Sequence, residues 1–222
     1  MDSSPATDPY AAPKANVGNV ELPSLAMRAI VARWLMFANA LGIVAGMVIT
    51  GLLYAHALSA QIGELQSTGV LLGAGIGCLR TVVTFASVVS FFVWLHTAYA
   101  RATRGVADAL FTPAASVGWW FVPVANLWMP LQAVRHLWQL SHSGGEWNRV
   151  APPPRIGIWW AAFLVSTGGL CTAMVVMLLP GWTIASRVLA YGAACLSIVA
   201  TLLAARIVGE ITAMQQQRLG VD

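Results

Sequence analysis

Residues 111–138 form the stretch FTPAASVGWWFVPVANLWMPLQAVRHLW, here called the Trp/Pro box, whose path decides how the rest of the chain is arranged. No charged residue occurs between positions 109 and 134, so this region is apolar enough to enter a membrane. Pro113, Pro123 and Pro130 interrupt it, and each proline removes a backbone hydrogen-bond donor. The region therefore either crosses a bilayer as a broken helix or returns to the side from which it entered.

The composition of the chain identifies it as an integral membrane protein. Of its 222 residues, 58% are hydrophobic and 9% are charged, whereas a soluble domain carries about 25% charged residues. Such a sequence excludes a soluble enzyme, a disordered regulator and a secreted disulfide scaffold. The formal net charge is +4, but the cations separate apolar segments instead of forming one basic patch. We therefore expect no nucleic-acid partner.

The remaining apolar segments predict the architecture, because a spanning helix needs about 20 residues. We expect an all-α membrane bundle of four transmembrane helices plus a proline-broken re-entrant or interfacial element at 109–140. The predicted spans are 34–58, 78–100, 156–179 and 186–207. Residues 25–215 then form a single transmembrane domain, flanked by a disordered cytoplasmic tail at 1–24 and a cytoplasmic tail at 216–222.

The positions of the cations favour a returning path for the box. If residues 109–134 crossed, six cations would lie on each side of the membrane, whereas a returning path places ten inside and two outside. The second distribution is the one that the positive-inside rule predicts. The ten are Lys14, Arg28, Arg33, Arg101, Arg104, Arg135, Arg149, Arg155, Arg206 and Arg218; the two are Arg80 and Arg187. We therefore predict a multi-pass protein of the bacterial inner membrane with both termini in the cytoplasm.

The second half of the box predicts an amphipathic helix at the cytoplasmic interface. Asn126 is a suitable N-cap for a helix over 127–140, and Pro130 fits its first turn. Its polar stripe consists of Gln132, Arg135, His136 and Gln139, and its apolar face of Leu131, Val134 and Trp138. Tryptophan is enriched at membrane interfaces, which fits the four tryptophans of the box.

The box also carries a family resemblance. Its string WWFVPVANLWMPLQAVRHLW closely resembles the signature of a bacterial membrane-protein family catalogued as domain of unknown function 4328. Further matches are Thr112, the Trp159–Trp160 pair, and the aromatic helix with Phe92, Trp94, Leu95, Ala98 and Tyr99, so the resemblance covers roughly residues 80–215. The signature residues are Pro113, Trp119, Trp120, Phe121, Pro123, Asn126, Trp128, Pro130, Arg135 and Trp138. The family usually has Asn where this chain has Arg101, and it implies no established activity.

Motifs for catalysis or metal binding are missing from the sequence. It contains no G-x-S-x-G, H-E-x-x-H or phosphate-loop pattern. His96, His136 and His142 follow no metal-ligand spacing, so we expect them to be interfacial side chains. We accordingly predict no catalytic residue, no metal site and no cofactor.

Two functions remain open at this point. Arg101, Arg104, Arg135 and Arg149 surround the box and either clamp a lipid headgroup or acidic partner, or serve topology alone. The first hypothesis is a non-catalytic protein that acts through contacts with membrane lipids, another membrane protein or a second copy of itself. The alternative is a small transporter or channel component in which the broken segment lines a polar cavity.

Small residues recur every four positions in the first span. Ala38, Gly42, Gly46 and Thr50 form this stripe, which allows close approach of another helix. We expect the stripe to pack within the bundle, with a homodimer face as the alternative.

Overall fold

The computed structural model describes residues 25–59, 63–104, 106, 108–180 and 183–219, and these residues form helices and turns without any strand. The four long helices are α1 (Leu25–Ser59), α2 (Gly63–Ala102), α5 (Pro154–Met177) and α6 (Thr183–Leu219). Between α2 and α5 lie α3 (Pro113–Gly118), η1 (Trp119–Phe121), η2 (Ala125–Leu127), α4 (Met129–Ser143) and η3 (Gly144–Arg149).

Each long helix contains a segment that is long and apolar enough to cross a bilayer. The segments are Leu25–Leu52, Gly75–Ala102, Pro154–Met177 and Ile184–Arg218. The predicted all-α membrane fold with four such helices is therefore confirmed. The helices extend beyond several predicted bounds, and α6 passes the boundary predicted at residue 215. The predicted tail at 1–24 and residues 220–222 lie outside the described residues.

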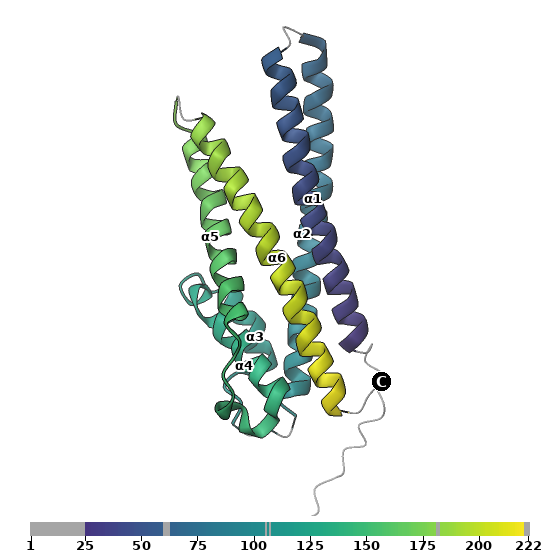
Figure 1. Cartoon of the computed structure of the whole chain (residues 1–222), viewed down its shortest axis with the longest axis vertical. Coiled ribbons are helices and arrows are strands. Elements are labelled where there is room, and N and C mark those ends of the chain that lie inside the picture. Colours follow the sequence, from purple (N-terminus) through teal and green to yellow (C-terminus); the bar gives the residue numbers. More distant parts are fainter. Residues whose placement is uncertain (1–24, 60–62, 105, 107, 181–182, 220–222) are drawn as a thin grey trace, which may run out of the picture.

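The long helices form two antiparallel hairpins, α1–α2 and α5–α6, and α1 also packs against α6 (Figure 1). The hairpins meet at the end that carries α3 and α4, here called the box end, and diverge toward the opposite, open end. Both the end of α2 and the start of α5 lie at the box end. With only 6 residues in α3 and 15 in α4, neither helix is long enough to cross a bilayer.

The core of the protein is concentrated at the box end. Fully buried side chains there include Trp94 and Tyr99 of α2, Leu137 of α4, Ile156 of α5 and Ile211 of α6. Toward the open end, most described side chains of the long helices are exposed. This difference has a physical reason, because lipid tails are as apolar as Leu and give no hydrophobic gain when spans pack together.

Candidate functional site

Trp120 of the box connects the two hairpins. The centroid of its ring lies 5.6 Å from that of Phe91 and 5.4 Å from that of Phe92, both on α2. On α5, Trp160 lies 5.5 Å and Phe163 5.9 Å away. All four pairs have the edge-to-face arrangement that aromatic rings prefer. The broken segment thus places one side chain between helices that belong to different hairpins.

A hydrogen bond joins α5 to the broken backbone of the box. Trp160 donates its indole N–H to the carbonyl oxygen of Leu127 at 2.9 Å. Pro130 lies three residues after Leu127 and has no N–H to donate to that carbonyl. A proline leaves a carbonyl about one turn upstream without its helical donor, and Trp160 supplies a donor to the carbonyl of Leu127.

The predicted role of Asn126 as a helix cap is wrong. Asn126 lies inside the 3-10 turn η2, and its backbone N–H donates to the carbonyl of Val122 at 2.7 Å. The following helix begins at Met129 and continues to Ser143, whereas the sequence predicts 127–140. Its first turn is closed by the N–H of Gln132, which donates to Trp128 at 3.2 Å. The backbone N–H groups that follow Asn126 already have acceptors in these turns, since Leu127 donates to the carbonyl of Val124 and Trp128 to that of Ala125. A capping side chain at Asn126 is therefore not needed.

His136 forms the centre of a buried polar network between α4 and α2. Its Nδ1 lies 2.7 Å from the hydroxyl of Tyr99, which also lies 3.1 Å from the carbonyl of Ala133. The backbone N–H of Leu110 donates to Nε2 at 3.5 Å. These partners are all satisfied if the imidazole is neutral with its proton on Nδ1, since Tyr99 then accepts from His136 and donates to Ala133.

The interfacial position predicted for His136 is wrong. The side chain is 2% exposed, and the ring of Trp147 lies edge-on against it at 4.7 Å between centroids. Burial lowers the pKa of His136 from its usual 6.5 to about 4. Helix α4 therefore has core contacts on two sides, with the exposed residues Gln132 and Arg135 between them. His96 and His142 are exposed, and their interfacial position stays a prediction.

The C-terminal part of α6 is fastened to α4 and α2. Gln215 donates its side-chain N–H to the hydroxyl of Ser141 at 2.8 Å and to the carbonyl of Ala98 at 3.1 Å. Arg218 donates to the carbonyl of Leu140 at 2.8 Å, near the end of α4 where carbonyls lack helical partners. These bonds fix the box end as one packed unit.

The four arginines that the sequence places around the box divide into two sets. Arg101 and Arg104 lie close enough for their charges to repel, and Arg28 of α1 joins them. Arg28 also donates to the hydroxyl of Thr97 on α2. Arg28 is a further member of this cluster that the sequence pattern does not single out, although its place at the start of the first apolar segment puts it at the same end as Arg101.

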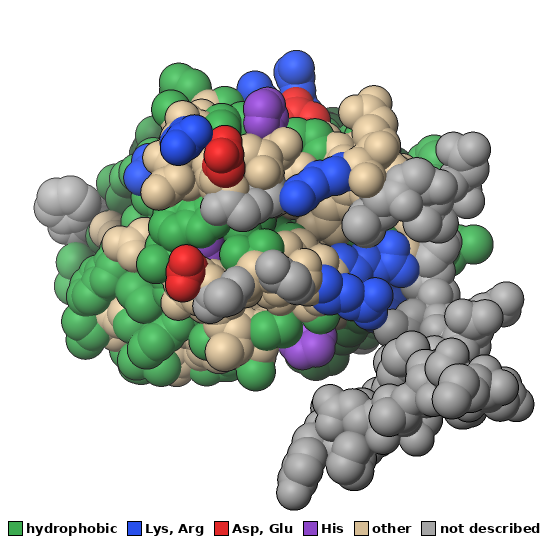
Figure 2. Space-filling view, turned by 90° about the horizontal axis from the view of Figure 1, so that it is seen from below, with side chains coloured by type: hydrophobic (Ala, Val, Ile, Leu, Met, Phe, Trp, Pro, Cys, Tyr) green, Lys and Arg blue, Asp and Glu red, His purple; other side chains and the backbone are tan. Residues whose placement is uncertain are grey.

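The other two arginines contact different parts of the box end. A guanidinium nitrogen of Arg135 lies 3.2 Å from the position that a Cβ at Gly157 would occupy. Arg149 forms an exposed ion pair with Glu146 at 3.4 Å. Figure 2 views the molecule from the box end and shows arginine side chains distributed over this face, with hydrophobic side chains at its flanks.

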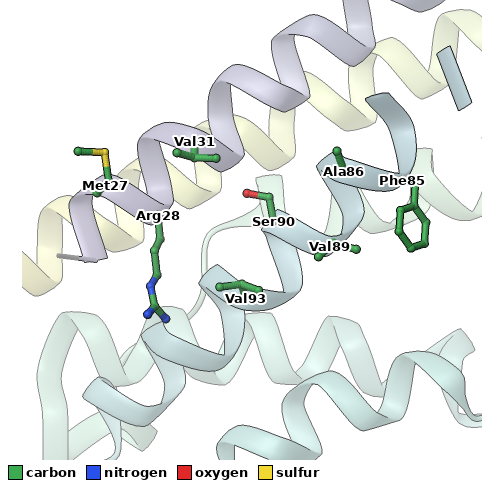
Figure 3. Close-up of a pocket in the computed structure, with 8 residues that line it drawn as sticks. All are labelled: Met27, Arg28, Val31, Phe85, Ala86, Val89, Ser90 and Val93. Atoms are coloured by element: carbon green, nitrogen blue, oxygen red, sulfur yellow. The ribbon is translucent and has the colours of Figure 1, made fainter. Parts of the chain in front are cut away.

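A groove beside Arg28 runs along the seam between α1 and α2. Its volume is about 510 Å³, and Arg28 extends at its box end (Figure 3). Apart from Arg28 and Ser90 its lining is apolar, and Phe85 and Val89 are exposed on its wall. The lining residues are Met27, Arg28, Val31, Phe85, Ala86, Val89, Ser90 and Val93.

The signature residues of the box are distributed over both its buried and its exposed sides. Pro113 begins α3 after the N-cap Thr112, and Pro130 is buried in the first turn of α4. Phe121 is 70% exposed and Trp128 46% exposed, so part of the box presents apolar surface. The remaining members, Trp119, Trp120, Pro123, Asn126, Arg135 and Trp138, occupy η1, the turn after it, η2 and α4.

Several buried polar atoms of the box lack a hydrogen-bond partner within the described part of the chain. They are the indole nitrogens of Trp119, Trp120 and Trp138 and the side-chain oxygen of Asn126. Within the same described residues, no group of three His, Cys, Asp or Glu side chains is placed to hold a metal ion.

Comparison with known proteins identifies one family. The family model described as "Domain of unknown function (DUF4328)" matches residues 57–213, which is more than half of the chain and includes the whole box. No curated protein and no solved structure shows a significant match.

Proposed function

We propose, from the premise that the chain belongs to the DUF4328 family, that it is a non-catalytic bacterial inner-membrane protein that holds an anionic phospholipid at its box end. The observation that carries this proposal is the position of Arg28 at the end of an apolar groove, within reach of the charges of Arg101 and Arg104. A cation cluster next to an apolar groove matches the two parts of a phospholipid.

The arginine cluster suits a phosphate headgroup. A guanidinium group presents its N–H donors in a fork that matches two phosphate oxygens. Three like charges near a low-dielectric region repel one another, and a bound anion reduces that repulsion. No Asp or Glu forms an ion pair with Arg28, Arg101 or Arg104 among the described residues. A lipid phosphate supplies the missing negative charge.

The groove suits an acyl chain of the same lipid. Its walls belong to the membrane-spanning segments of α1 and α2, so they face hydrocarbon. Its volume of about 510 Å³ falls within the usual range for ligand pockets, about 300–1,000 Å³. An acyl chain that follows the groove away from Arg28 places its headgroup at the arginines.

The proposed orientation puts the box end and both termini in the cytoplasm. This side receives ten of the twelve cations of the sequence, and the cytoplasmic leaflet is the one whose anionic lipids attract such residues. A reporter protein that is active only in the cytoplasm, fused at residue 145 between α4 and α5, is expected to be active. A periplasmic reporter at this position would contradict the orientation.

The absence of catalysis is proposed from the chemistry of His136. Both nitrogens of its ring are engaged, one by Tyr99 and the other by the N–H of Leu110. A general base needs a free nitrogen lone pair next to the substrate. The contacts of His136 instead support a role in positioning α4 against α2.

Native mass spectrometry of the full-length protein tests the lipid site. Released from vesicles with equal phosphatidylglycerol and phosphatidylcholine, the wild type is expected to retain phosphatidylglycerol preferentially. The triple variant Arg28→Gln, Arg101→Gln, Arg104→Gln is expected to lose that preference. Arg149→Gln is the matched control, because this exposed arginine pairs with Glu146 outside the cluster. Equal retention of the two lipids by the wild type would refute the proposal.

The alternative of a transporter or channel component has weaker support. It requires the broken segment to line a polar cavity, whereas Trp120 of that segment packs among aromatic side chains of α2 and α5. Measured flux of ions or small solutes through liposomes containing the purified protein would favour it over the lipid site.

A further inference from the structure

The sequence leaves open whether the Trp/Pro box lies along the membrane interface or enters the bilayer, and its contacts with two spans measure its depth. The ring of Phe121 lies against that of Phe92 on α2, with 5.6 Å between their centroids. Trp120, the residue before Phe121, lies 5.9 Å from Phe163 on α5. The 3-10 turn η1, to which both box residues belong, is therefore fixed at the level of these two positions in the spans.

The two spans give the same depth for η1. Phe92 lies nine residues before Arg101, near the end of α2. Phe163 lies eight residues after Arg155, near the start of α5. With a rise of 1.5 Å per residue, both contacts lie about 12–14 Å from the level of these arginines. Arginines at the ends of spans mark the polar boundary of a membrane, and half of the hydrocarbon layer is about 15 Å thick. These distances put η1 deep within the leaflet on the box side.

The surface that the box presents at this depth is apolar. Phe121 is 70% and Val124 67% exposed, and Trp128 is exposed as well. No charged residue occurs between positions 109 and 134. A loop in water would expose an unusual apolar patch if it carried these side chains together, whereas lipid tails are as apolar as the side chains themselves. The patch continues the exposed apolar surface of the spans, to which Val165 of α5 belongs.

The backbone of the exposed turns also suits hydrocarbon. N–H and C=O groups in a membrane interior must bond within the protein, because water is absent there. Asn126, Leu127 and Trp128 each donate to a carbonyl three or four residues earlier. Pro123 has no N–H that needs an acceptor, and the carbonyl of Leu127 accepts from Trp160. These groups therefore need no water as a partner.

Helix α4 leads the chain back to the membrane boundary. His136 of α4 contacts Tyr99 of α2, which lies two residues before Arg101 and thus about 3 Å from its level. Gln132 and Arg135 are exposed polar side chains on the same helix. This position fits a segment that enters and leaves the bilayer on one side.

We propose that the box is a re-entrant element whose exposed side chains Phe121, Val124 and Trp128 insert among the acyl chains of the leaflet on the box side. The partner of this surface is lipid hydrocarbon, in contrast to the headgroup proposed for Arg28. Its depth and its apolar character both favour a partner of that kind. The insertion does not depend on the proposed phospholipid site, because any bilayer-forming lipid supplies acyl chains.

Electron paramagnetic resonance of spin labels on the full-length protein in phosphatidylcholine vesicles tests the insertion. The native cysteines, which are exposed, are first replaced with serine; they are Cys78, Cys171 and Cys195. Labels are then attached to Phe121→Cys and Val124→Cys. Val165→Cys on α5 is the reference in hydrocarbon, and Arg149→Cys on the exposed turn η3 is the reference in water.

The labels on the box are expected to match the label on α5. At Phe121→Cys and Val124→Cys, collisions with oxygen should exceed those with a water-soluble nickel complex severalfold, as at Val165→Cys. Arg149→Cys should show the reverse order. A box label that behaves like the one at Arg149→Cys would overturn the proposal, because the box would then lie in water or at the interface. A label that neither reagent reaches would also overturn it, because another protein surface would then cover the box.

A charge placed on the same surface gives an independent measurement. Val124→Asp is expected to lower the Tm of the protein in nanodiscs by at least about 5 °C, because a carboxylate is costly in hydrocarbon. Asn148→Asp is the matched control, since it adds the same charge on the exposed turn η3. The control should change the Tm by no more than about 2 °C. Equal Tm values for the two variants would overturn the proposal.

Discussion

Replacing Trp120 with Ala is expected to separate the two hairpins at the box end. Truncation of a large aromatic side chain in a core costs about 3–5 kcal/mol, and Trp120 makes four edge-to-face contacts to α2 and α5. Because Trp120 is only partly buried, we expect the lower end of that range, about 3 kcal/mol. For a chain of this length, this loss corresponds to a decrease in Tm of roughly 6–12 °C.

Thermal unfolding in one detergent, followed by near-UV circular dichroism, measures this loss. Trp34→Ala is the matched control, because Trp34 is 70% exposed on α1 and has a single described ring contact, with Phe37 at 6.2 Å. The control is expected to lower the Tm by no more than about 2 °C, in line with a surface substitution. Equal effects of the two substitutions would refute the role of Trp120 between the hairpins.

Three further predictions concern the polar contacts of the box end. The folded state should lose stability as the pH falls from about 6.5 toward 4, because burial lowers the pKa of His136 to about 4 and the unfolded chain binds the proton first. In acid titrations of unfolding, His136→Gln should reduce this dependence, and an unchanged dependence would contradict the assignment. Tyr99→Phe removes a hydroxyl bonded to both His136 and Ala133 and should cost about 1–3 kcal/mol in denaturant unfolding; a neutral result would contradict the network. Glu210→Gln breaks partly exposed ion pairs to Arg155 and Arg206 and should cost about 1 kcal/mol or less, a loss that shrinks in high salt; a loss independent of salt would argue against an electrostatic cause.

The composition of the chain predicts that it is a membrane protein, and the positions of its cations predict that the box returns to the side of entry. Both predictions depend on the cost of transferring side chains between water and lipid. The apolar segments match the four long helices, and the cation count predicts a box that returns to the side of entry. The structure agrees, with α3 and α4 both too short to cross. These features need no knowledge of which side chains touch.

The site itself depends on tertiary contacts that periodicity does not encode. His136 belongs to a polar stripe in sequence, but Trp147 from η3 covers it, so the second buried side of α4 is visible only in the fold. Arg28 and Arg101 are far apart in the chain and become neighbours because α1 and α2 are antiparallel. Asn126 is a residue type that commonly caps helices, but the backbone N–H groups around it already form hydrogen bonds within consecutive turns.

The central claim is that an anionic phospholipid occupies the groove between α1 and α2 with its headgroup at Arg28. Photolabelling with phosphatidylglycerol that carries a diazirine in its acyl chain, followed by peptide mapping, tests this most directly. Labels are expected on groove residues such as Val31, Phe85 and Val89, and Arg28→Gln should reduce them severalfold. Labels spread evenly over the exposed faces of all four long helices, or unchanged in Arg28→Gln, would contradict the claim.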